Sequence, residues 1–114
     1  MFDHHISPRV VEFILTRELN ELSTLTPGKI SEALGLNPVE MTLAFESDQH
    51  IPLERFILRE KMYRAFFLIE KNQGITIEEL AKKMGFHQTH EFANEFETFF
   101  LIDPGKYKEL VRLS

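Results

Sequence analysis

Two histidines and an acid lie close together in the segment 85–100, GFHQTHEFANEFETFF. His87 and His90 are three positions apart and Glu91 follows directly, and side chains at i and i+3 of a helix can bind one metal ion. We nevertheless expect no metal site, because His87 stands at the helix start and no third ligand is evident nearby. The order of the residues also differs from that of a zinc protease motif. The chain has no Cys, so thiolate ligands and thiol nucleophiles are excluded.

Catalytic arrangements are not apparent elsewhere. We find no Ser/His/Asp arrangement, no glycine-rich phosphate loop and no paired-carboxylate cleft. The sequence therefore predicts a protein that is not an enzyme and uses no cofactor.

The charge of two segments is the stronger chemical signal. Residues 87–99 contain Glu91, Glu95 and Glu97 and no Lys or Arg. Residues 37–49 repeat this pattern with three acids and no base, namely Glu40, Glu46 and Asp48. Each acid taken alone is compatible with an ordinary solvated helix face, but together they make two faces that repel polyanions.

The elements that carry these segments are expected to be helices. Helix starts are indicated by Thr26–Pro27, Asn37–Pro38 and Asp103–Pro104, and by a capping box of Thr76 and Glu79. Ser7 and Pro8 similarly indicate the start of an N-terminal helix that continues past Leu22. No run alternates polar and apolar residues convincingly, so we predict an all-α fold of about seven helices.

The bulk properties indicate one globular domain, 1–114. The chain has 114 residues, 43% of them hydrophobic and 27% charged, and a net charge of -5. No segment approaches the ~20 apolar residues of a membrane span, and the start has no basic region before an apolar run. We therefore expect a cytoplasmic protein without a membrane partner.

An internal repeat relates two parts of the chain about fifty residues apart. Each part reads as a helix, a turn containing Gly35 or Gly85, and a second helix. Ile30 matches Leu80, Ala33 lies near Ala81, Leu36 matches Phe86, Met41 matches Phe92, and Phe45 matches Phe96. This pattern predicts two helix-turn-helix units at 26–47 and 76–99, separated by a long apolar helix at 52–72.

From Ile30 to Lys108 the chain resembles the DNA-binding domain of AraC/XylS-type transcription regulators. The most diagnostic matches are Leu80, Ala81, Met84, Gly85, Phe86, Phe92, Phe96, Phe100, Pro104 and Tyr107. The resemblance implies two helix-turn-helix subdomains joined by a central linker helix, each directing its second helix into a DNA major groove. It also implies a bacterial protein, and we expect this chain to carry no small-molecule effector domain of the kind found in many members of that family.

The resemblance assigns candidate DNA contacts by position. The base-facing candidates are Val39, Thr42 and Leu43 in the first unit, and Thr89, His90, Ala93 and Asn94 in the second. The phosphate-contact candidates are Lys29, Lys61, Lys82, Lys83, Lys106 and Lys108. Asn94 can bond bidentately to adenine, whereas the first set offers one hydroxyl and two apolar groups.

The chain departs from the family pattern at several of these positions. The basic pair that usually follows each recognition helix is replaced by Glu46 and Ser47, and by Glu97 and Thr98. His50 and Leu101 replace the usual glycines, and Lys61 replaces an arginine.

Two hypotheses follow from these matches and departures. The first is a transcription regulator that binds double-stranded DNA mainly through its second unit, with RNA polymerase or another regulator as a possible further partner. The second is the same fold without DNA binding, acting as an acidic protein-interaction module.

Overall fold

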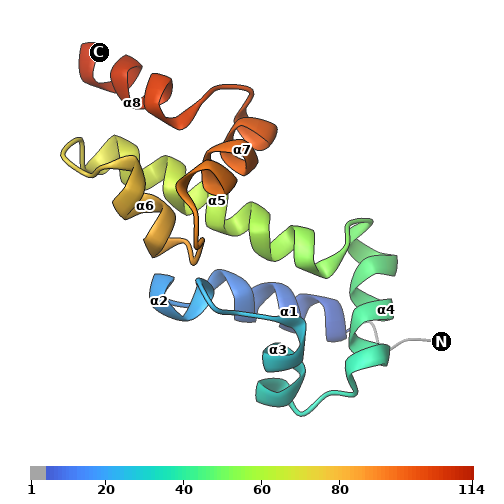
Figure 1. The fold of residues 1–114 in the computed structure, drawn as a ribbon. Helices are drawn as coiled ribbons and strands as arrows, with labels where there is room; N and C mark the ends of the chain where they lie inside the picture. The colour runs from blue at the N-terminus through green and yellow to red at the C-terminus, as the bar shows by residue number, and fades with distance from the viewer. Residues whose placement is uncertain (1–4) are drawn as a thin grey trace. The chain divides into compact units, whose positions relative to one another are not determined.

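The fold is entirely helical over the residues that the structure describes. The structure is a computed structural model and describes residues 5–114, which form eight helices and no strand (Figure 1). The helices are α1 (Ile6–Leu15), α2 (Leu19–Leu22), α3 (Pro27–Leu34), α4 (Pro38–Gln49), α5 (Leu53–Lys71), α6 (Ile77–Lys83), α7 (Thr89–Phe100) and α8 (Pro104–Leu113). The predicted all-α class is confirmed, including a central helix between two helix-turn-helix pairs.

The N-terminal helix is divided where the sequence predicts one continuous helix. The hydroxyl of Thr16 donates to the carbonyl oxygen of Glu12 at 2.7 Å, and Nε of Arg17 donates to the carbonyl oxygen of Phe13 at 3.0 Å. These side chains bond to carbonyls in the last turn of α1, where the helix ends at the cap residue Thr16. Glu18 is extended, with φ -69° and ψ 157°, and the chain turns into the short α2.

The expected cap at Ser7 is wrong. The helix begins at Ile6, two residues before the expected start at Pro8, and Ser7 is buried inside its first turn. The Ser7 hydroxyl accepts a hydrogen bond from Nε2 of Gln49 on α4 at 3.3 Å. A tertiary contact has therefore replaced the local cap.

The remaining predicted helix starts are confirmed. The side chains of Thr26 and Asn37 accept bonds from the backbone of Lys29 and Glu40, and that of Asp103 accepts from Gly105 and Lys106. Thr76 and Glu79 form the complete capping box. Helix-start residues therefore locate α3, α4, α6 and α8 because each cap is a local interaction.

The chain groups into two compact units, Met1–Glu60 and Lys61–Ser114. In the first unit, α1 packs on α4, and α3 packs on α4. Its core consists of fully buried side chains from these helices, α2 and the start of α5, among them Val10, Ile14, Leu22, Ile30, Met41, Phe45 and Leu53. Phe45 and Phe56 meet edge to face, with ring centroids 5.2 Å apart.

The second unit is built around aromatic rings. The Phe66 ring of α5 stacks on Tyr107 of α8 with centroids 4.3 Å apart, and it lies 4.8 Å from Phe100 of α7. Phe92 and Phe96 are fully buried beneath the outer face of α7. These contacts fix α7 between α5 and α8 within the unit, which holds its outer side chains in place.

None of the helices in residues 5–114 combines the length and apolarity needed to cross a bilayer.

Candidate nucleic-acid interface

The two helix-turn-helix units have the same turn geometry. Gly35 and Gly85 both adopt positive φ, 66° and 86°, which glycine tolerates without strain. The backbone N–H of Leu36 donates to Ser31 at 2.9 Å, and that of Phe86 donates to Ala81 at 3.0 Å. These six-to-one bonds are the Schellman closure of a helix end. The repeat predicted from the sequence is thus present in the backbone.

The hydrogen bonds of the turn show that one residue pairing predicted for the repeat, Ala33 with Ala81, is wrong. The hydrogen bonds align Ser31 with Ala81, and both residues are buried against their second helix. Ala33, which the sequence placed near Ala81, is exposed and corresponds to Lys83. Both buried positions hold a small side chain, and the hydroxyl of Ser31 donates to the carbonyl of Gly28 at 2.9 Å.

The second helices, α4 and α7, also match residue by residue. Each has twelve residues, and each buries two large side chains one turn apart, Met41 and Phe45 in α4 and Phe92 and Phe96 in α7. The opposite face of each helix therefore points away from its own unit. In a helix-turn-helix protein this second helix lies in the major groove, with its N-terminal residues at the base edges.

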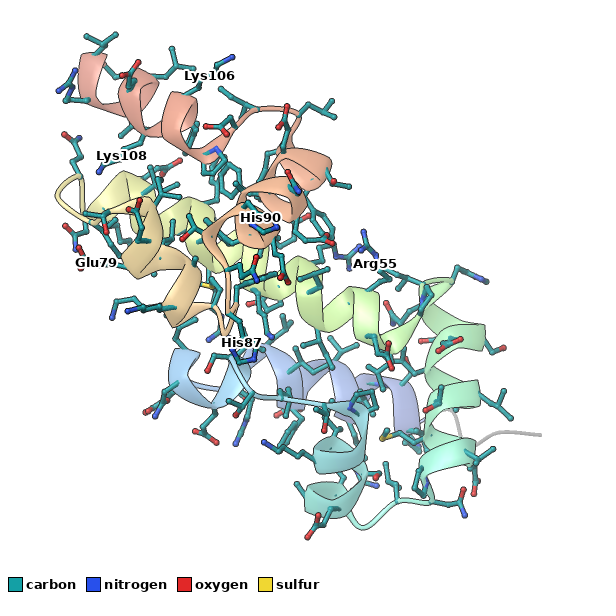
Figure 2. The ribbon with its side chains drawn as sticks, viewed as in Figure 1. Arg55, Glu79, His87, His90, Lys106 and Lys108 are labelled. Carbon is teal, nitrogen blue, oxygen red and sulfur yellow. The ribbon has the colours of Figure 1, made fainter. Side chains whose placement is uncertain are left out.

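The outer face of α7 carries groups that can read bases. His90 and Asn94 are exposed and lie one turn apart, whereas Thr89 and Ala93 are half-buried toward the core. Figure 2 shows His90 on α7 and His87 in the turn before it. Asn94 offers an amide that can pair with adenine, and His90 can donate or accept. Of the four base-facing candidates predicted in α7, two are therefore exposed on the outer face and two are half-buried beside it.

The outer face of α4 is apolar at the same positions. Val39 is 68% exposed and Leu43 is 51% exposed, and Thr42 beside them is half-buried. Together with Pro38 they line a shallow surface hollow. This face offers van der Waals contact and a single hydroxyl.

The acids of these helices have local partners that the sequence did not reveal. The carboxylate of Glu46 accepts from the backbone N–H of Leu53 at 3.4 Å, and Asp48 accepts from the side chain of Gln49 at 3.1 Å. Glu40 and Glu91 lie in the first turns of α4 and α7, where the helix macrodipole favours a negative charge. Glu40, Glu46 and Glu91 therefore each have a favourable interaction with a helix N-terminus.

The first helices of the two units differ in charge. Lys82 and Lys83 are exposed in the last turn of α6. The turn hydrogen bonds align them with Glu32 and Ala33 of α3, which are also exposed. The second unit thus presents two cations where the first presents one carboxylate and a methyl group. Aligning the sequences of the two helix-turn-helix units in this register reveals the difference in charge.

The other phosphate-contact candidates are placed less favourably. Nζ of Lys29 donates to the carbonyl of Thr24 at 3.0 Å, and Lys61 is half-buried on α5, where burial lowers the pKa of its ammonium group. Lys106 is exposed on α8. Lys108 lines a surface hollow with Gln73 and extends toward the turn between α5 and α6 (Figure 2). Lys82 and Lys83 are therefore the strongest candidates for contacts with DNA phosphates.

Among residues 5–114, no three His, Asp or Glu side chains come close enough together to hold a metal ion.

Solved structures share this arrangement. The chain superimposes on a transcriptional regulator from Chromobacterium violaceum, described as containing an AraC-type DNA-binding domain, with a TM-score of 0.82 and 16% identity over 94% of this chain and 92% of that chain. A DNA-binding transcriptional dual regulator from Escherichia coli K-12 gives 0.81 and 21%, covering 96% of this chain and 94% of the other. The fold implied by the resemblance is confirmed.

Sequence comparison adds a further similar protein. The Msm operon regulatory protein of Streptococcus mutans serotype c (strain ATCC 700610 / UA159) is 24% identical over 90 residues, which is 79% of this chain. The match spans 32% of that protein's length. No protein-family model matches the chain.

Proposed function

We propose that this AraC-type fold binds double-stranded DNA as a bacterial, cytoplasmic transcription regulator, with α7 in the major groove and the second unit supplying most of the affinity. One observation carries the proposal. The second unit combines an exposed hydrogen-bonding pair, His90 and Asn94, with two exposed lysines at the end of the preceding helix. Residues of the first helix cross the phosphate backbone in this motif, while those of the second reach the bases.

The expected electrostatic contributions to DNA affinity differ between the two units. Each phosphate neutralised by a Lys or Arg changes log K by about 0.9 per tenfold change in salt. Lys82 and Lys83 provide such contacts in the second unit, and Glu32 and Ala33 provide none in the first. The acids on α7 reduce this gain, but the Debye length of ~8 Å at physiological salt limits the range of their repulsion.

A salt titration with random-sequence duplex DNA tests the proposal. We expect binding at low ionic strength that weakens steeply as salt rises. The double substitution Lys82→Ala and Lys83→Ala should weaken binding to every sequence and lower the salt slope by up to about 1.8, from two lost phosphate contacts. Lys71→Ala is the matched control, because Lys71 is also an exposed lysine in the last turn of a helix but lies outside both helix-turn-helix pairs.

Base readout is tested separately through Asn94. Asn94→Ala should alter base preference in a selection from random duplexes, since its amide can bond to both N6 and N7 of adenine. The salt slope should stay close to that of the wild type. Failure to bind any duplex even at low ionic strength would refute DNA binding and leave the protein-interaction hypothesis, whose partner would be a basic protein such as another regulator or RNA polymerase.

A further inference from the structure

The base-facing candidates of α4 form an apolar surface whose chemical preference has not been assigned so far. It consists of Pro38, Val39, Thr42 and Leu43, and we call it the α4 apolar surface. Val39 and Leu43 are the most exposed of its large side chains. The opposite face of α4 buries Met41, Ala44 and Phe45 in the core of the first unit, so the described residues leave the α4 apolar surface open to solvent.

The internal repeat indicates what this surface faces. Val39 and Leu43 hold the positions that His90 and Asn94 hold in α7, because the two helices are equal in length and bury equivalent residues. If α7 presents its pair to base edges, then α4 presents Val39 and Leu43 to base edges in the same manner. Neither Val nor Leu can donate or accept a hydrogen bond, so readout there must use an apolar feature of the base.

The major groove offers one prominent apolar feature, the methyl group at C5 of thymine. Methylated cytosine presents a methyl group at the same ring position. We propose that the α4 apolar surface reads the C5 methyl groups of pyrimidines, so that the first unit selects by methyl contact while the second selects by hydrogen bonding. This inference rests on the proposed DNA binding and adds the chemical feature that the first unit recognises.

The extent of the surface favours a base edge over a protein partner. A stable protein–protein interface involves about 20–30 residues on each side. The α4 apolar surface has four residues and is bordered by the exposed acid Glu40, which suits contact with one or two methyl groups. Glu46, the nearest acid on the next turn, is held by the backbone of Leu53. The negative charge of Glu46 is therefore partly offset by the N-terminus of α5.

Deoxyuridine substitution tests the inference. A duplex site is first selected by the wild-type protein from a random library, and each thymine is then replaced in turn by deoxyuridine, which lacks only the methyl group. We expect about fourfold weaker binding for each methyl group buried against Val39 or Leu43. Leu43→Ala and Val39→Ala should bind the thymine duplex more weakly and lose the distinction between thymine and uracil at those positions.

Two further measurements show whether the α4 apolar surface and the methyl group itself cause the difference in binding. Asn94→Ala is the control, because it alters α7 and should keep the thymine-to-uracil ratio set by α4. Replacing a sensitive T·A pair by C·G should weaken binding, and 5-methylcytosine at the same position should recover part of it if the methyl group itself is read. Circular dichroism of the two alanine variants confirms folding, which is expected because both side chains are exposed.

Each outcome decides the inference. Binding to DNA without any methyl-sensitive position, or an unchanged thymine-to-uracil ratio in Leu43→Ala, overturns the methyl readout and leaves DNA binding intact. Failure to select any duplex at low salt overturns both proposals. A surface that instead binds a protein would show Leu43→Ala with wild-type DNA affinity on every duplex.

Discussion

The side-chain carboxylate of Glu46 accepts a hydrogen bond from the backbone N–H of Leu53 at 3.4 Å. Leu53 is the first residue of α5, so its N–H has no partner within the helix. A carboxylate at this point also interacts favourably with the positive end of the helix macrodipole. Glu46 therefore joins the end of α4 to the start of α5.

Replacing Glu46 should destabilise the protein. Glu46→Ala leaves the Leu53 N–H without its acceptor and should lower the free energy of unfolding by about 0.5–1 kcal/mol, at the low end for a helix cap because the bond is long. Chemical denaturation measures the change. Glu97→Ala is the control, since Glu97 holds the equivalent position in α7 and is exposed, and it should stay within about 0.5 kcal/mol of the wild type. Equal effects of the two substitutions would contradict the capping role.

The helix ends at His50 and Leu101 should be improved by glycine. Both residues end their helices in the left-handed region, with φ 58° and 60°, which costs a side-chain-bearing residue about 1–2 kcal/mol. Leu101 is 87% exposed and loses little packing when it is replaced. Leu101→Gly should therefore raise the free energy of unfolding by about 0.5–1 kcal/mol, after allowing for the extra freedom of glycine in the unfolded chain.

The opposite substitution provides the control for this prediction. Gly35 has φ 66°, and a Cβ added there would meet no atom within 4 Å. Gly35→Ala should destabilise by about 1 kcal/mol through backbone strain alone. Thermal unfolding of Leu101→Gly, His50→Gly and Gly35→Ala, compared in one buffer, should move the midpoint upward for the first two and downward for the third. A lower midpoint for Leu101→Gly would refute the strain argument.

The sequence predicted features that depend on interactions between neighbouring residues, but not those that depend on contacts between distant parts of the chain. Caps such as Thr76–Glu79 are local and were predicted correctly, as was the repeat of buried Phe45 and Phe96. The cap at Ser7 was wrong because Gln49, far along the chain, bonds to that hydroxyl. The bond of Glu46 to Leu53 depends on the turn between two helices, so no pattern within one helix could reveal it. The candidate DNA contacts came from resemblance and remain predictions.

Stability should fall between about pH 10 and pH 12 because of Tyr107. Partial burial, followed by the hydrogen bond to Glu70 and the negative charge of Glu70, raises the pKa of Tyr107 from 10.0 to about 12. The hydroxyl donates to Oε1 of Glu70 at 2.6 Å. The unfolded chain loses this proton first as pH rises, so the stabilisation is present below pH 10 and is lost through the folded pKa.

Phenolate absorbance measures this pKa directly. The chain has two tyrosines, so a Tyr63→Phe background leaves Tyr107 as the only signal. In that background Glu70→Gln should lower the pKa of Tyr107 but leave it above 10, because burial is the largest cause. Tyr107→Phe should flatten the alkaline fall in stability. A Tyr107 pKa that returns fully to 10 in Glu70→Gln would show that Glu70 alone is responsible.

Installing the lysines of the second unit in the first should strengthen DNA binding. Glu32 and Ala33 align with Lys82 and Lys83 through the shared turn hydrogen bonds, and both are exposed on α3. Glu32→Lys with Ala33→Lys adds two cations and removes one carboxylate at the point where this motif meets the phosphate backbone. We expect tighter binding to random duplex and a salt slope steeper by up to about 1.8, which a fluorescence titration over a range of salt concentrations measures. The same double change at Glu109 and Leu110, an exposed Glu and apolar neighbour on α8, controls for net charge alone. Equal gains from the two variants would mean that charge anywhere on the surface suffices, and would contradict a specific role for the end of α3.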